Sequence, residues 1–299
     1  MTKNNRKKAV AQAISTAVAL CWAIMQVESA QAATLTVNNL NDSGVGSLRD
    51  TINMATSNDV VEFLLGNHLS TITLTSGAIA IAKNLTINGP GANLLTINGN
   101  NQFPVFDINA ADVTLSGLAI AGDINAYNSR NLTFTNSTIN GHNVNIDSNL
   151  TLINSTINSQ YLEINGGLTG IDDSNVTALS RSTIGGNLTS PSGNLTISTG
   201  SLYINGGNII NSEAGGNIIV TAESVVITGG SQVTIPNSTS GNSGQISDGL
   251  GGNISLNVGD LLLLRRPVPE PSAIAGSILA GSLAWLVKKK QAAFPKAKV

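Results

Sequence analysis

The sequence predicts an all-β domain built as a parallel β-helix, in which short strands of successive coils stack and pair in parallel. Three observations predict this fold. A ten-residue segment recurs along the chain, apolar and polar residues alternate inside it, and 31 glycines and abundant asparagine accompany only 3% aromatic residues. Alternation of this kind is typical of strands that bury one face.

The repeat is clearest in two neighbouring copies. NLTFTNSTIN begins at Asn131 and NLTLINSTIN begins at Asn149, and eight of the ten positions are identical. Looser copies of the first half occur at Asn84–Ile87, Asn194–Ile197 and Gly216–Val220. Self-similarity at a fixed spacing is the usual signature of a repeat architecture, and here it predicts coils of about 18–22 residues. Each coil is expected to hold two or three strands of about four to six residues, separated by short turns.

The short repeat favours a solenoid over a β-sandwich. One unit is too small to bury its own Leu and Ile side chains, whereas stacked units bury them together. Strands of successive coils then lie about 4.8 Å apart, so that equivalent side chains lie directly above one another. We therefore expect asparagines at matching turn positions to form side-chain amide ladders. A narrow coil also leaves little room for aromatic rings, which accounts for their scarcity.

The first coil is expected to carry a helical cap. The segment Ser47–Asp50 matches a capping box with Asp in place of Glu. Apolar residues then recur at helical spacing at Leu48, Ile52 and Ala55. We predict a short amphipathic helix over residues 47–56 that covers the exposed strand edge of the first coil.

Two further patterns concern turns and the last coil. Gly-Gly pairs recur at coil spacing and predict turns, because no Gly-Lys-Ser/Thr follows them as in a phosphate-binding loop. At the far end, Ile254, Leu256 and Val258 predict a last strand, which Leu261–Leu264 finishes or covers. The glycine pairs are 166–167, 185–186, 206–207, 215–216 and 251–252.

Residues 1–32 are predicted to be a secretory signal peptide. A positively charged start is followed by an apolar run over residues 9–25, and the small residues Ala30 and Ala32 precede Ala33. This order places cleavage by signal peptidase between Ala32 and Ala33. The alternative for the same run is a short membrane anchor that is not cleaved.

Residues 267–299 are predicted to be a sorting and membrane segment. The segment has a proline-glutamate-proline motif, an uncharged stretch and a basic cluster: Pro269, Glu270 and Pro271; residues 272–287; and Lys288, Lys289 and Lys290. The uncharged stretch is shorter than the ~20 residues of a full membrane span. Lysine side chains at its end can nevertheless reach the interface. The positive-inside rule places the basic cluster in the cytoplasm and the preceding domain outside.

This three-part order resembles the PEP-CTERM sorting signal of Gram-negative bacteria, including cyanobacteria. The resemblance implies an exosortase-type membrane protease that cleaves near Pro269, Glu270 and Pro271 and releases the protein or transfers it to the outer surface. It also implies that a C-terminal transmembrane helix anchors the chain before processing. The alternative is an ordinary single-pass anchor that is never cleaved.

The remaining residues, 33–266, form the predicted β-helix domain, and they carry two further resemblances. The segment Asn38–Arg49 and the LTINGPGANLLTINGNN that starts at Leu85 are similar to bacterial surface proteins with right-handed parallel β-helices. Those proteins often begin with a GSLRxAI cap, from which Asp50 and Thr51 depart here while Ile52 is retained. GGNISLNVGDLLLLRR from Gly251 looks like the repeats of cyanobacterial filamentous-haemagglutinin-like proteins. The resemblances imply a right-handed coil and an adhesin-like role.

Composition excludes several classes of protein. Cys21 is the only cysteine, so neither a disulfide framework nor a cysteine-based zinc site is expected. The 15 acidic and 6 basic residues between positions 33 and 266 give a net charge of about −9. Such a charge argues against a nucleic-acid partner, which would require a basic face. We expect no cofactor and no metal.

Candidate catalytic residues are few and scattered. Asp147 and Glu163 lie near one coil apart, and a glycosidase needs two carboxyl groups facing each other across the bond that is cleaved. Asp172 and Asp173 follow, but the calcium-binding repeat GGxGxDxUx is absent. Isolated acidic residues on a polar coil are usually solvated, and we expect the protein not to be an enzyme. His68 and His142 are likewise expected at turns or on the surface.

We therefore hold one main hypothesis and two alternatives. The main hypothesis is a non-catalytic, adhesin-like β-helix at the cell surface or in the extracellular matrix, with extracellular polysaccharide as a potential partner. The first alternative is a polysaccharide lyase or hydrolase on the same scaffold, which would place Tyr161, Tyr203, Asp147 and Glu163 on one groove. The second is an uncleaved, membrane-anchored surface protein.

Overall fold

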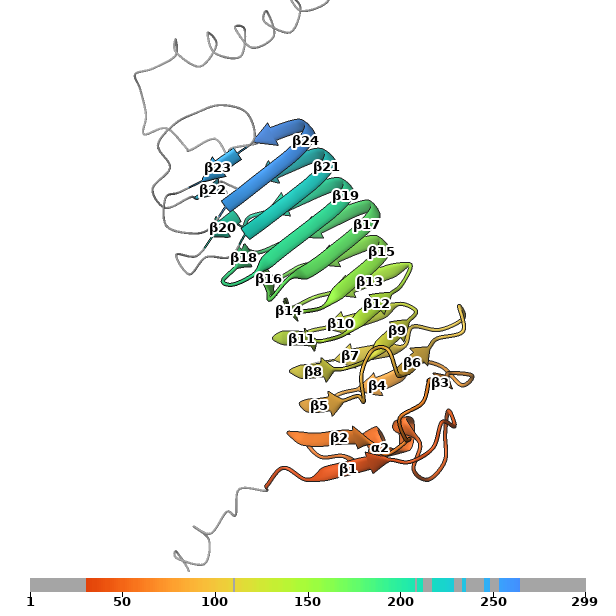
Figure 1. The fold of residues 1–299 in the computed structure, drawn as a ribbon. Coiled ribbons are helices and arrows are strands. Elements are labelled where there is room, and N and C mark those ends of the chain that lie inside the picture. Colours follow the sequence, from red (N-terminus) through yellow and green to blue (C-terminus); the bar gives the residue numbers. More distant parts are fainter. Residues whose placement is uncertain are drawn as a thin grey trace, which may run out of the picture. The chain divides into compact units, whose positions relative to one another are not determined.

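The chain forms a parallel β-solenoid (Figure 1). A computed structural model describes residues 31–109, 111–207, 209–211, 217–228, 233–234, 245–247 and 253–263. The signal peptide predicted for residues 1–32 lies almost wholly outside these ranges, and so does the whole predicted segment 267–299. Within the described residues, no helix is long and apolar enough to cross a membrane.

The described residues form one helix and twenty-four strands. The first part of the chain contains β1 (Thr34–Val37), α2 (Leu48–Met54), β2 (Asp59–Phe63), β3 (Ser70–Thr73), β4 (Ile79–Ile81), β5 (Leu85–Asn88), β6 (Leu95–Asn98), β7 (Phe106–Asn109), β8 (Val113–Ser116), β9 (Ala119–Ala121), β10 (Ile124–Tyr127), β11 (Asn131–Thr135), β12 (Thr138–Asn140) and β13 (Asn143–Ile146). The second part contains β14 (Asn149–Ile153), β15 (Thr156–Ile164), β16 (Leu168–Ile171), β17 (Ser174–Ile184), β18 (Leu188–Ser190), β19 (Asn194–Asn205), β20 (Ile209–Asn211), β21 (Asn217–Thr228), β22 (Val233–Thr234), β23 (Gln245–Ser247) and β24 (Asn253–Leu263).

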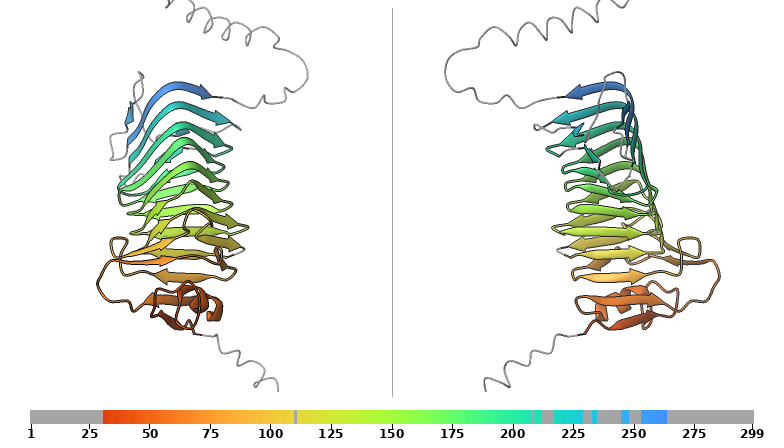
Figure 2. Two further views of the ribbon diagram at one scale, coloured as in Figure 1. Left: turned by 90° about the vertical axis from the view of Figure 1, so that its right-hand side faces the viewer. Right: turned by 60° about the vertical axis from the view of Figure 1, so that its left-hand side comes forward.

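Each coil contributes to two sheets. One sheet has ten strands in the order β1-β2-β5-β8-β11-β14-β16-β18-β20-β22. The other sheet has two limbs that merge at β15. The first limb consists of β3, β6, β9 and β12, the second limb consists of β4, β7, β10 and β13, and the long strands β15, β17, β19, β21 and β24 belong to both. Figure 2 shows the bend in these long strands where the two limbs meet.

The two best sequence repeats lie directly on top of each other, as predicted. Asn131 pairs with Asn149 and Leu132 with Leu150 in the parallel register of β11 and β14. Leu132, Leu150 and Leu152 are fully buried, and they belong to one continuous apolar core. Burying each such side chain contributes about 1.5–3 kcal/mol, but only where a neighbouring coil covers it.

The looser copies do not all occupy the same place in a coil. Residues 85–87 belong to β5 of the ten-stranded sheet, whereas Asn194–Ile197 begins β19 in the other sheet. There, Thr196 lies opposite Asn175, which lies opposite Thr156 in β15. An Asn-apolar-Thr-apolar pattern suits any strand with one buried face, so that it does not identify the sheet.

The predicted strand length does not hold from β15 onward in the two-limbed sheet, whereas β14 and β16 of the ten-stranded sheet keep it. The strands β19 and β21 each span 12 residues, because the two limbs join without a turn. Register shifts between Ser159 and Tyr161 and between Ala178 and Arg181 mark the bend. A bulge of this kind turns the backbone through a corner while the ladder continues on both sides.

The predicted amide ladders are present at several turns. Asn154 donates through Nδ2 to Oδ1 of Asn136 at 2.8 Å, 18 residues away. A further amide pair, from Asn158 to Asn140 at 2.8 Å, joins strand residues of β15 and β12. Asn136 and Asn154 have φ of 48° and 46°, and Asp172 in the next coil has φ of 53°. Asparagine and aspartate tolerate this left-handed backbone better than other non-glycine residues. The ladder residues therefore stabilise the turn as well as its stacking.

The glycine pairs within the described residues lie at turns, as predicted. Gly166, Gly186 and Gly207 approach the backbone of the coil before them. A Cβ atom at Gly207 would collide with the carbonyl oxygen of Gly186. Only residues without side chains allow successive turns to stack this closely. The pairs 215–216 and 251–252 lie outside the described residues.

The predicted helical cap is confirmed, with shorter bounds. Helix α2 covers Leu48–Met54, and the Ser47 side chain accepts a hydrogen bond from the Asp50 amide at its N-terminus. In a capping box the side chain three residues on would accept a hydrogen bond from the N-cap amide. Here the Asp50 carboxylate accepts from the Gly44 amide instead, at 3.2 Å. Leu48 and Ile52 are fully buried in the common core.

Two cations join α2 to the strand beside it. Arg49 donates to the carbonyl oxygens of Gly77 and Ala78, at 2.6 and 2.7 Å, just before β4. Lys83, just after β4, donates to carbonyl oxygens at the end of α2, including Ala55 at 2.6 Å. Among the described strands β4 pairs only with β7, so these contacts protect an otherwise open strand edge.

The predicted last strand is also confirmed. The strand β24 contains Ile254, Leu256 and Val258 and continues without a break to Leu263. An antiparallel strand, β23, pairs with its first part. The sequence pattern did not predict β23, which changes the direction of the chain at the end of the second sheet.

Asp42 fixes the loop that leads into the cap. It pairs with Arg49 at 2.7 Å and accepts hydrogen bonds from the backbone and hydroxyl groups of Thr75 and Ser76. Burial raises the pKa of the Asp42 carboxyl, but the bonds from Ser76, Arg49 and Thr75 outweigh this effect. They hold the pKa well below its ordinary value of 3.8.

We predict that the cap loosens in acid. Because the folded pKa of Asp42 is lowered, its contribution to stability is complete above 3.8 and is lost as the pH falls toward the folded value. The melting temperature, measured from about pH 6 to about pH 2.5, should fall less steeply in Asp42→Asn. Some slope should remain, since hydrogen bonds from the Thr56 and Ala33 amides also lower the pKa of Asp59. An unchanged slope in Asp42→Asn would contradict this role.

Candidate functional site

The outward face of the second limb carries all three tyrosines of the chain. Tyr127 ends β10, Tyr161 lies in β15 and Tyr203 lies in β19, and they are 39%, 42% and 38% exposed. The three strands are separated from one another by one intervening strand each, β13 and β17. The tyrosines are therefore placed at regular intervals of about 10 Å along the stack.

Strand register brings two of these tyrosines into one patch. Tyr161 lies opposite Arg181 of β17, and Arg181 lies opposite Ser201 of β19. Two residues farther along, Glu163 lies opposite Thr183, which lies opposite Tyr203. We call these six residues the tyrosine patch: Tyr161, Glu163, Arg181, Thr183, Ser201 and Tyr203.

The core determines which side chains face outward in the patch. Leu162, Ser182 and Leu202 alternate with the patch residues and are buried. Successive side chains of a strand point to opposite faces, so burying these three residues turns the tyrosines, Arg181 and Glu163 toward solvent. A flat parallel sheet holds these outward positions in fixed rows.

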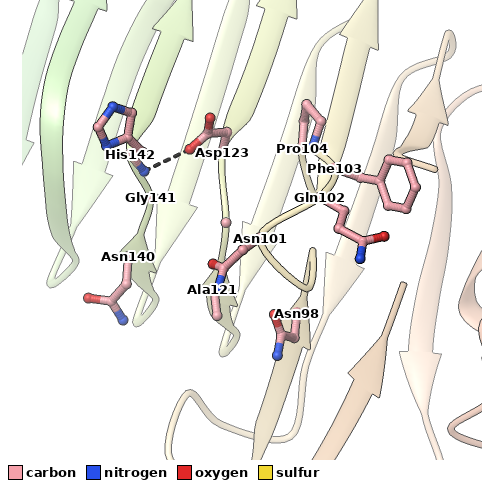
Figure 3. Close-up of a pocket in the computed structure, with 11 residues that line it drawn as sticks. Asn98, Asn101, Gln102, Phe103, Pro104, Ala121, Asp123, Asn140, Gly141 and His142 are labelled. Atoms are coloured by element: carbon pink, nitrogen blue, oxygen red, sulfur yellow. Dashed lines mark hydrogen bonds between the residues drawn. The ribbon is translucent and has the colours of Figure 1, made fainter. Parts of the chain in front are cut away.

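A groove lies beside the patch, where the two limbs meet. One pocket of about 330 Å³ is lined by Asn98, Asn101, Gln102, Phe103, Pro104, Ala121, Gly122, Asp123, Asn140, Gly141 and His142 (Figure 3). A second pocket of about 550 Å³ shares Asn140, Gly141 and His142 with the first. It continues past Asn158 and Gln160 to Leu179. The two pockets therefore follow the bend through several coils.

Asp123 organises the turn between the pockets and is the one carboxylate that lines them. Its Oδ1 accepts hydrogen bonds from the backbone amides of His142 and Asn143, at 2.7 and 2.8 Å, and Figure 3 shows the first of these bonds. Its Oδ2 accepts from Nδ2 of Asn143 at 3.3 Å. Oδ1 thus holds the backbone of the next coil and Oδ2 holds its Asn143 side chain, so that Asp123 has a structural task.

His142 connects the groove to the tyrosine patch. Its ring meets the ring of Tyr161 edge-on, with centroids 5.7 Å apart and an interplanar angle of 80°. Such an arrangement is favourable for two aromatic rings and orients both. His142 lies exposed at a turn, as does His68, in line with the sequence prediction.

The residues named for a polysaccharide-cleaving enzyme share one face but form no enclosed groove together. Tyr161, Glu163 and Tyr203 lie in the patch, and Asp147 follows β13 on the same side, where it accepts a hydrogen bond from Nδ2 of Asn165. Within the two described pockets, none of these four residues is part of the lining. Asp172 and Asp173 lie apart, in the turn between β16 and β17.

No cluster of three or more His, Cys, Asp or Glu side chains with metal-binding geometry occurs in the described part of the chain. Asp172 and Asp173 are instead used as hydrogen-bond acceptors. Asp172 accepts from the Ser192 hydroxyl at 3.0 Å, and Asp173 accepts from the backbone and side-chain nitrogens of Asn194 at 3.0 and 2.7 Å. Both carboxylates therefore join one coil to the next.

Sequence reasoning missed two features of this region. It did not predict that Arg181 lies between Tyr161 and Tyr203, and it did not predict the groove along the bend. The offset from Tyr161 to Arg181 is 20 residues, which lies within the predicted coil length, but a range of that width does not fix which residues of neighbouring coils pair. Only the register of β15 and β17 aligns these two residues.

Comparison with protein-family models, with curated proteins and with solved structures finds no match for this chain.

Proposed function

We propose that this protein is a non-catalytic, adhesin-like element of the bacterial cell surface or extracellular matrix, and that it binds polysaccharide. The tyrosine patch, with exposed aromatic rings among hydroxyl and charged groups, is the observation that carries the proposal. Aromatic faces pack against the apolar faces of sugar rings, while the surrounding polar groups hydrogen-bond the hydroxyls.

Repetition supports binding to long chains. The outward amides of Asn125 and Asn145 lie in one row with Glu163 and Thr183, one residue per coil. Each contact to a sugar is weak, but several neighbouring contacts on one polymer raise the effective concentration of the rest. A stiff stack of coils keeps these contacts at constant spacing.

Export and processing are part of the same proposal. Signal peptidase cleaves before Ala33, and an exosortase-type enzyme recognises Pro269, Glu270 and Pro271 of a PEP-CTERM signal. The C-terminal helix and the Lys288–Lys290 cluster hold the chain in the inner membrane until then. The coils are right-handed in this proposal, as the resemblance to right-handed parallel β-helix surface proteins implies. We also propose that the protein is related to the filamentous-haemagglutinin-like proteins of cyanobacteria.

We predict that the exported protein binds polysaccharide without cleaving it. On a panel of bacterial and plant polysaccharides, binding to long chains should exceed binding to short oligosaccharides of the same repeat by at least about 100-fold, because avidity depends on length. No reducing ends should be released. If reducing ends are released, and Glu163→Gln or Asp147→Asn abolishes their release, the alternative of a polysaccharide hydrolase or lyase replaces this proposal.

We also predict that the surface-exposed protein lacks its C-terminal tail. Mass spectrometry of protein shaved from intact cells should detect peptides up to the region of Pro269 but none that contains Trp285. Glu270→Ala should retain the tail, because the processing motif is altered. Peptides containing Trp285 in the wild-type surface protein would instead support a single-pass membrane anchor.

A further inference from the structure

We propose that the tyrosine patch binds a heteropolysaccharide in which a uronic acid lies between neutral pyranoses, with Arg181 receiving the uronate. This inference rests on the proposed function and specifies its ligand. Its central observation is an exposed arginine between two exposed tyrosines on a flat sheet face.

Arg181 is the one cation on the second limb among the strand residues described there. The described part of the chain holds four cations, and Arg49 and Lys83 serve the helical cap. Within the described residues, the Arg181 guanidinium has neither a hydrogen bond nor an ion pair. Its planar fork is therefore available for the two oxygens of a ligand carboxylate.

The tyrosines place the sugars on both sides of the arginine. Tyr161 lies one strand before Arg181 and Tyr203 lies one strand after it, about 10 Å apart along the stack. This distance is comparable with the length of a disaccharide in an extended polysaccharide. A sugar on each tyrosine therefore leaves the intervening position over β17, where Arg181 and Thr183 face solvent.

Glu163 limits the density of charge in the ligand. It lies one strand and two residues from Arg181, and the exported domain has a net charge of about −9. Consecutive uronates would place a second carboxylate near Glu163, which is unfavourable. A uronate flanked by neutral sugars avoids this repulsion and leaves Glu163 to accept hydrogen bonds from sugar hydroxyls.

The test uses the full-length chain and matched pairs of polysaccharides: hyaluronan, glucuronoxylan and xanthan, each in its native form and after reduction of the carboxyl groups. Affinity electrophoresis should show stronger retardation by the native form of at least one pair, by about fivefold or more. Arg181→Gln should abolish the difference within that pair. Arg130→Gln is the matched control, since Arg130 is an exposed arginine next to the ten-stranded sheet.

The outcomes separate this inference from the proposed function. Tyr161→Ala and Tyr203→Ala should weaken binding to both forms of the pair, because they remove the surfaces on which the sugars stack. Equal binding to native and reduced forms, unchanged by Arg181→Gln, would overturn the uronate site and leave polysaccharide binding intact. Absence of binding to every polysaccharide by correctly folded protein would overturn both.

A second and independent observation concerns the predicted signal-peptide cleavage site. The backbone nitrogen of Ala33 donates to Oδ1 of Asp59 at 2.8 Å, and Asp59 is only 4% exposed. The other carboxylate oxygen accepts from the amide and hydroxyl of Thr56, at 2.7 and 3.0 Å. The Ala33 carbonyl in turn accepts from the Val60 amide at 2.8 Å. This nitrogen is therefore held directly against a carboxylate.

We infer that signal-peptide removal creates an ion pair between the new α-ammonium of Ala33 and Asp59, and that the pair stabilises the first coil. Hydrolysis adds water across the Ala32–Ala33 bond and leaves a carboxylate on Ala32 and an amine on Ala33. That amine takes up the proton that the new carboxyl group releases. A neutral amide donor thus becomes a charged one against the same oxygen, and such bonds are markedly stronger.

The test compares processed and unprocessed chains. Mass spectrometry should find Ala33 at the N-terminus of the exported wild type, and Ala32→Leu should retain the leader. Asp59→Asn should lower the melting temperature of the first coil by about 5 °C more in the processed form than in the leader-bearing form. The Ala33 amine should also react slowly with an amine reagent near neutral pH, because its pKa is raised by the partner carboxylate.

Equal effects of Asp59→Asn in the two forms, or an Ala33 amine that reacts like a free peptide amine, would overturn the ion pair. The amine measurement decides the question even where Asp59→Asn does not fold. Detection of the retained leader in the wild-type cell-surface protein would instead overturn the cleavage step on which this inference rests.

Discussion

A coil of this chain cannot bury its own apolar face, and every other feature depends on that constraint. Leu132 and Leu150 are covered only because one coil lies on the next. Parallel pairing between coils then fixes which residues lie above one another. The stacking that buries the apolar side chains therefore also sets the strand register. The positions of the inward rows then determine the outward rows of side chains, including the tyrosine patch.

The solenoid architecture could be predicted from the sequence because each repeat carries apolar residues on one face only. Alternation in NLTFTNSTIN identified strands, the 18-residue offset identified stacking, and Ser47, Leu48 and Ile52 identified the cap. It was insufficient for assigning strands to sheets. Asn194–Ile197 has the same pattern as Asn84–Ile87 but lies in the other sheet, since the pattern records one buried face and not which one.

The candidate site was harder to predict for the same reason. Tyr161 and Tyr203 were recognised as potential partners of sugars, but the position of Arg181 between them was not predicted. Coil length changes along the chain, from 26 residues between Asn58 and Asn84 to 18 between Asn136 and Asn154. Any alignment by a fixed repeat therefore drifts, and residues that become neighbours through register, such as Tyr161 and Arg181, are not paired by counting.

The merging of the two limbs at β15 has a consequence for how such a protein can change over generations. Where the limbs are joined by a turn, as at Gly122 and Gly141, added residues can project outward without disturbing the ladder on either side. Where β17 or β19 passes through the corner as one continuous strand, an insertion would shift the register of an entire limb. Length variation between the limbs is therefore expected in the coils before β15, while the continuous corner of β17 and β19 is restricted to substitutions.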